Sequence, residues 1–91
     1  MTKFQRGLYE NHLRARYHTI WEAYDRPSKA KENAYEWCVN KALKKGAIEW
    51  AIPTWNTFQF TFSAIYPDPE TGVLRMMYET SCNSYDFEIS A

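Results

Sequence analysis

The switch from helix to strand is written in residues 41–52, KALKKGAIEWAI. Before Gly46, apolar residues recur at helical spacing, and three lysines lie where cations suit the negative end of a helix dipole. Gly46 suits the left-handed position that ends many helices. After it, Ile48, Trp50 and Ile52 alternate with other residues at the two-residue period of a strand. This stretch predicts an α+β protein whose helices precede its strands.

Two helices are predicted upstream of Gly46. The first runs from about Phe4 to Tyr24, and Pro27 disfavours helical geometry in the residue before it. The second begins after a capping serine at position 28 and runs to about Lys45. Because only a few residues link them, the two helices are expected to form an N-terminal helical hairpin.

An antiparallel meander of three or four strands is predicted downstream. The first strand closes at Pro53, and a short connection at residues 54–57 leads to the second strand, which carries the alternating row Phe58, Phe60 and Phe62. We expect this row to be core rather than an exposed aromatic platform of the kind that binds RNA, because no basic residue lies within it.

The rest of the meander follows from turn chemistry and alternation. Residues 67–72, PDPETG, are typical of a turn, residues 74–79 form the returning strand, and residues 85–89 are suited to a short fourth strand. We expect the helical hairpin to pack on one face of the sheet, and the other face to meet water or a partner.

The charge is divided between the two parts of the chain. Residues 1–46 carry ten Lys and Arg against five Asp and Glu, whereas residues 47–91 carry one Arg against six acids. The 91 residues are expected to form one domain, basic and helical over 1–46 and acidic and β-sheet over 47–91. A surface polarised in this way favours oriented docking on a partner and also permits self-association.

The sequence predicts a cytoplasmic protein with no membrane partner. No apolar run approaches the ~20 residues that a spanning helix needs, and the N-terminus lacks the apolar core of a signal peptide. In a reducing compartment, Cys38 and Cys82 are expected to be free thiols. Cys38 lies on the apolar stripe of the second helix and is expected to be buried.

Nothing in the sequence predicts catalysis, a metal or a cofactor. His12, His18 and the two cysteines do not have the spacing of a metal site, and the three glycines form no phosphate-binding loop. The protein is therefore expected not to be an enzyme. A small hydrolase or nuclease would need His12 or His18 beside a carboxylate in a cleft.

Three cations are candidates for an anion or partner site. Lys29 and Lys31 fall in the first turn of the second helix, where cations are unfavourable, and Arg26 is close in sequence. Together with the free N–H groups of a helix start, Arg26, Lys29 and Lys31 could bind a phosphate or an acidic surface. The alternative is a solvated corner without a ligand.

Trp55 and Asn56 are candidates for a protein interface. A large apolar ring is unusual in a tight connection, and an exposed tryptophan beside a strand edge is a typical interface anchor. The alternative is that Trp55 folds back over the edge of the sheet.

Two segments resemble small uncharacterised proteins of phage and prophage origin. One is residues 24–28, YDRPS, with the residues that follow it, and the other is residues 56–60, NTFQF, leading into residues 69–72, PETG. In the first segment the similarity extends to Lys31, Ala34, Trp37 and Cys38. It covers roughly residues 15–80 and implies a short accessory protein made in a bacterial host, with no catalytic residues to transfer.

The function expected from these observations is that of a small, non-enzymatic accessory protein that binds another protein, encoded by a phage or prophage and modulating its host. The alternative is a nucleic-acid-binding module that uses the basic helical half. Against the alternative stands the acidic C-terminal half, since small dedicated nucleic-acid binders are usually basic overall.

Overall fold

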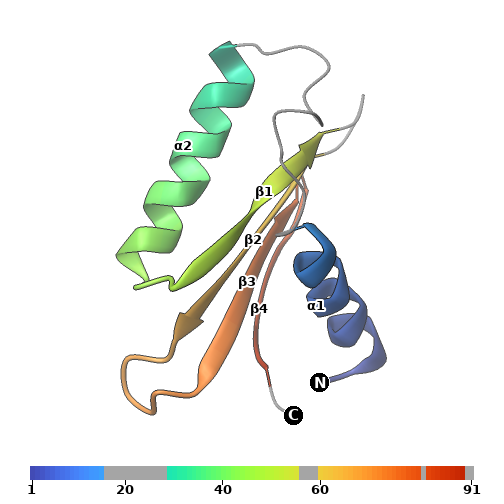
Figure 1. Ribbon diagram of the computed structural model, residues 1–91, viewed down its shortest axis with the longest axis vertical. Coiled ribbons are helices and arrows are strands. Elements are labelled where there is room, and N and C mark those ends of the chain that lie inside the picture. Colours follow the sequence, from blue (N-terminus) through green and yellow to red (C-terminus); the bar gives the residue numbers. More distant parts are fainter. Residues whose placement is uncertain (16–28, 56–59, 81, 90–91) are drawn as a thin grey trace.

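A computed structural model describes residues 1–15, 29–55, 60–80 and 82–89 (Figure 1). These residues form two helices and a four-stranded sheet, which confirms the α+β class. The elements are α1 (Lys3–Ala15), α2 (Lys29–Lys44), β1 (Glu49–Trp55), β2 (Phe60–Pro67), β3 (Leu74–Thr80) and β4 (Ser84–Glu88). The second half of the first predicted helix lies outside the described residues.

The strands form the antiparallel meander β1-β2-β3-β4. The prediction that the first strand closes at Pro53 is wrong, because β1 continues to Trp55 with a register shift between Ala51 and Thr54. A proline has no N–H to donate, but an irregular position on an edge strand does not need one. As a result, Trp55 is the last residue of β1, paired with Phe60, and does not lie in the connection.

Gly46 ends α2 as predicted. It has a φ of 81°, and its N–H donates to the carbonyl of Leu43, 3.0 Å away. The next N–H, of Ala47, donates to the carbonyl of Ala42, also at 3.0 Å. These two bonds are the Schellman pattern, which satisfies the last carbonyls of a helix and turns the chain sharply. The turn directs the chain from α2 straight into β1.

The predicted turn at residues 67–72 is also confirmed. The Asp68 carboxylate accepts hydrogen bonds from the backbone N–H groups of Glu70 and Thr71, at 2.8 and 3.2 Å. These bonds hold the pKa of Asp68 below its usual value. Gly72 has a φ of 76°, which a glycine adopts without strain.

The two helices lie on opposite faces of the sheet (Figure 1). Cys38 and Ala42 of α2 pack into one buried cluster with alternate residues of β2 and with Met77. Leu8 of α1 packs into a second cluster with Ile65, Met76, Tyr78 and Phe87. Successive strand residues point to opposite faces, so these two clusters are separated by the sheet itself.

The prediction that both helices cover one face of the sheet is therefore wrong. The described parts of α1 and α2 do not pack on each other as a hairpin, because the sheet lies between them. The face expected to meet water or a partner carries the α1 cluster instead. Of the phenylalanine row, Phe62 is buried in the α2 cluster as predicted, whereas the side chains of Phe58 and Phe60 lie outside the described part of the structure.

Helix α1 crosses its face of the sheet from β4 to β1. At its start, the ring of Phe4 meets that of Tyr85 edge-on, with centroids 5.4 Å apart. Leu8 contacts the middle of the sheet, and His12 reaches Ser63 on β2 and Glu49 on β1. Because the helix crosses the strands, it leaves the corner of this face near Leu74 open.

Candidate functional site

The predicted anion site is described only in part. Lys29 is the first residue of α2 and Lys31 lies in its first turn, as predicted, but their side chains and all of Arg26 lie outside the described part of the structure. The same holds for the side chain of Trp55 and for Asn56. The arrangement of these five side chains therefore stays a prediction.

The basic end of α2 meets the acidic sheet directly. The Lys41 ammonium donates to the Glu79 carboxylate on β3 at 2.7 Å, and Lys45 donates to Asp86 on β4 at 3.0 Å. The Ser84 hydroxyl also donates to Glu79. Part of the charge division between the two halves of the chain is thus an intramolecular attraction that fastens α2 to the sheet.

Asp86 is the centre of this polar group. Its carboxylate accepts hydrogen bonds from the Tyr66 hydroxyl, from Lys45 and from Nε of Arg75, the last at 2.9 Å. Burial disfavours ionisation of Asp86, but the hydrogen bonds from Tyr66, Lys45 and Arg75 outweigh it and lower its pKa. Burial likewise opposes the charge of Lys45, and the bond to Asp86 overcomes it and raises the pKa of Lys45.

The outer surface of α2 carries exposed apolar side chains. Trp37 is 60% exposed, Leu43 51% and Ile48, just beyond the Gly46 turn, 64%. They are three of the six large apolar side chains that are exposed in the described residues. We call these three side chains together the α2 apolar surface, although Trp37 and Leu43, six residues apart, lie about 120° from each other around the helix.

A cation lies beside the Trp37 ring. The Lys41 ammonium lies 5.1 Å from the centroid of the Trp37 ring while it also binds Glu79. A cation over an indole face is attracted by the ring's π-electrons. The contact favours this position of the ring, and any such preference reduces the entropy lost on binding.

His12 forms a buried polar network between α1 and the sheet. Its ring is completely buried, with Nδ1 2.6 Å from Oγ of Ser63 and Nε2 2.9 Å from Oε1 of Glu49. An ionised carboxylate only accepts, so Nε2 carries a proton, and in the neutral ring the Ser63 hydroxyl donates to Nδ1. A hydrolase would need a histidine beside a carboxylate in a cleft; His12 lies beside the Glu49 carboxylate, but its ring is completely buried.

The Ser63 hydroxyl is shielded, however. Ser63 is only 4% exposed and is bonded to the completely buried His12, whereas the Glu49 side chain is 33% exposed. Neither His12, Ser63 nor Glu49 lines the pocket described next. The same bonds satisfy polar groups that would otherwise be costly to bury.

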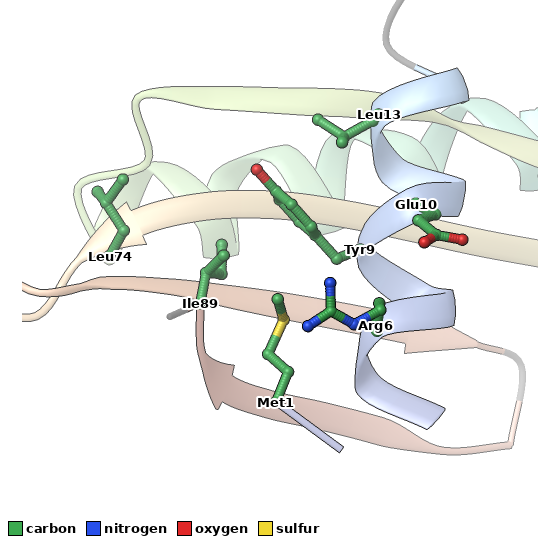
Figure 2. A pocket seen from close by; sticks show the side chains of 7 residues that line it. All are labelled: Met1, Arg6, Tyr9, Glu10, Leu13, Leu74 and Ile89. Carbon is green, nitrogen blue, oxygen red and sulfur yellow. The ribbon is translucent and has the colours of Figure 1, made fainter. Parts of the chain in front are cut away.

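A pocket of about 480 Å³ lies on the α1 face, at the corner that the helix leaves open (Figure 2). One wall is formed by one side of α1, from which the lining residues project at spacings of three and four positions along the helix. The floor is Leu74 and Ile89, whose backbones are joined by a 2.9 Å hydrogen bond from the Ile89 N–H to the Leu74 carbonyl. The lining consists of Met1, Arg6, Tyr9, Glu10, Leu13, Leu74 and Ile89.

Both cysteines are free, as expected. Cys38 is buried under α2, and burial raises the pKa of its thiol to about 11. Cys82 is exposed. Across the described residues, no three His, Cys, Asp or Glu side chains are grouped so that they would hold a metal ion.

Within the part of the chain that the structure describes, no helix combines the length and the apolar character needed to cross a bilayer. No protein-family model matches this chain, and no curated protein or solved structure is significantly similar to it.

Proposed function

We propose that this protein is a small, non-enzymatic accessory protein that binds another protein through the α2 apolar surface. The observation that carries the proposal is Trp37, which is 60% exposed and has the Lys41 ammonium 5.1 Å from its ring centroid. Tryptophan is enriched among the residues that dominate binding energy in protein interfaces. Leu43 and Ile48 add apolar contact area at the end of the same helix and just after it.

The charges around Trp37 favour a protein partner over the alternative of a nucleic acid. Lys41 and Lys45 are two of the ten cations in the basic half, and both are paired with carboxylates of the sheet. Lysines that are already paired with carboxylates are less available to neutralise phosphates, so fewer counterions would be released from a nucleic acid on binding. We still expect Lys29 and Lys31 to form a second contact, with an acidic region of the partner.

The burial of His12 and Ser63 supports a non-enzymatic role, because a nucleophile needs access to its substrate. The accessory, host-modulating character and the phage or prophage origin rest only on the resemblance of residues 24–28 and 56–60. A cytoplasmic location is part of the proposal, because the partner would be a protein of the bacterial host.

The test is capture of a partner from bacterial lysate at low salt after nuclease treatment. We compare the wild-type protein with Trp37→Ala and with Val73→Ala, which removes an exposed apolar side chain from the β2–β3 turn. The wild type and Val73→Ala are expected to retain one stoichiometric protein, and Trp37→Ala to lose it by about tenfold or more. Circular dichroism establishes that each variant is folded.

Two results would contradict the proposal. Equal capture by Trp37→Ala and by the wild type would exclude the α2 apolar surface as the binding site. Recovery of nucleic acid that disappears at high salt, without a protein, would favour the alternative. Sedimentation of the purified chain at several concentrations distinguishes binding of a host protein from self-association. Without a partner present, only self-association makes the sedimentation depend on the concentration of the chain.

A further inference from the structure

The pocket beside α1 has the composition of a small-molecule site. Its volume, about 480 Å³, lies within the usual range for such sites, and apolar side chains predominate in its lining. Leu13 comes from α1, and Leu74 and Ile89 from the ends of neighbouring strands. An apolar ligand body placed there would cover Leu74, which is 42% exposed in the protein as it stands.

The Arg6 guanidinium lies at this apolar surface. Figure 2 shows the Arg6 guanidinium turned toward Met1 and the ring of Tyr9, while the Glu10 carboxylate points the other way. Arg6 and Glu10 are four residues apart on the helix, yet no ion pair of Arg6 is formed within the described residues. An arginine without a carboxylate partner is suited to bind one, since its planar N–H groups match both oxygens.

We propose that this pocket binds a small apolar monocarboxylate, such as a medium-chain fatty acid. Its tail lies on Leu13, Leu74 and Ile89, and its carboxylate binds the Arg6 guanidinium. The assignment rests on charge complementarity with the Arg6 guanidinium, which is turned toward the pocket while the Glu10 carboxylate of the same lining points away, and on the apolar side chains of Leu13, Leu74 and Ile89. A dicarboxylate would place its second charge against that apolar surface, which costs desolvation without a partner.

This ligand site is independent of the proposed protein contact. The pocket lies on the α1 face of the sheet, and the α2 apolar surface belongs to the helix on the opposite face. Loss of ligand binding and loss of partner capture are therefore measured separately, with variants that have no residue in common.

The experiment is a titration of the isotope-labelled, full-length chain with decanoate, followed by amide chemical shifts in NMR. Saturable shifts are expected at the lining residues of α1 and at Leu74 and Ile89. Arg6→Gln is expected to raise Kd about tenfold, the loss of one charge-assisted interaction. Lys3→Gln, which removes a cation of the same helix outside the pocket, is expected to leave Kd unchanged.

A second pair of variants keeps the test valid if Arg6→Gln affects folding. Leu74→Glu places an anion on the pocket floor and is expected to abolish decanoate binding, whereas Val73→Glu adds the same charge at an exposed residue outside the pocket and leaves it intact. Decanol, which has the same tail without a charge, is expected to bind more weakly. Absence of saturable shifts, equal binding of decanol, or an unchanged Kd in Arg6→Gln would each overturn the proposal.

Discussion

Met76 and Met77 are neighbours in β3, and both are almost completely buried, but they lie in different hydrophobic cores. Met76 packs with Leu8 under α1, and Met77 packs with Cys38 under α2. Because adjacent strand residues face opposite sides of a sheet, this pair marks a sheet that is covered on both sides.

The two methionines are expected to contribute similarly to stability. Met76→Ala and Met77→Ala should each lower the free energy of unfolding by about 2–4 kcal/mol, because each leaves a cavity in a separate core. Urea denaturation measures this, with Val73→Ala as an exposed control. If either methionine variant were as stable as the control, one face of the sheet would not be covered as described.

His12 is expected to be a stability residue. His12→Ala should lower the free energy of unfolding by about 2–3 kcal/mol, because Ser63 and Glu49 each lose a hydrogen-bond partner between α1 and the sheet. Asn11→Ala, at the exposed neighbouring position, serves as the control. A His12→Ala variant with wild-type stability would show that the network does not hold α1 in place.

Lys41 and Lys44 are only three residues apart, but their substitution should have different effects. Lys41→Met leaves the buried Glu79 carboxylate without its cation, and we expect a loss of about 1.5–3 kcal/mol in urea denaturation. Lys44 is exposed and has no ion pair within the described residues, so Lys44→Met should change stability by less than about 0.5 kcal/mol.

A double-mutant cycle isolates the Lys41 interaction. Glu79→Gln in the Lys41→Met background removes the unpaired charge and should recover part of the lost stability. If the changes in the free energy of unfolding caused by the two substitutions simply added, the ion pair would contribute nothing to the attachment of α2.

Asp86 should make stability depend on acid pH. Its folded-state pKa is below the ordinary value of an aspartate, so its contribution to stability is fully present above the unfolded-state pKa and is lost as pH falls through the folded-state pKa. We expect Asp86→Asn to be less stable than the wild type at about pH 7 and the difference to shrink progressively below about pH 5. A difference that stays constant down to the acid limit would contradict the lowered pKa.

The two thiols should differ in reactivity toward Ellman's reagent. Cys82 is exposed and should react fast at mildly alkaline pH, whereas Cys38, with a pKa raised to about 11 by burial, should react only as the protein unfolds. Cys82→Ser should remove the fast phase, and denaturant should restore one reactive thiol. A fast phase that survives in Cys82→Ser would mean that α2 opens readily.

Several local features could be predicted from the sequence alone. The end of α2 at Gly46, the turn at residues 67–72 and the burial of Cys38 all follow from short-range preferences that act within a few residues. The strand boundary at Pro53 was predicted wrongly, because an edge strand can pass a proline at an irregular position.

The covering of both sheet faces had a signal in the sequence. Five consecutive residues from Phe62 to Tyr66 are buried, and four of them are apolar. Met76 and Met77 are likewise consecutive, buried and apolar. Continuous apolar runs are typical of strands buried on both faces, whereas one-sided strands alternate. The alternation of Phe58, Phe60 and Phe62 obscured this second pattern.

The sequence by itself determined the order of helices and strands, the turns at Gly46 and at residues 67–72 and the division of charge, because each depends on residues close together in the chain. Only the tertiary structure decided which partners those charges have and which face each helix covers. Lys41 and Glu79 are 38 residues apart, and His12 and Ser63 are 51 apart. Such pairs form only when the sheet has closed between the helices, and no local preference of either residue specifies the other.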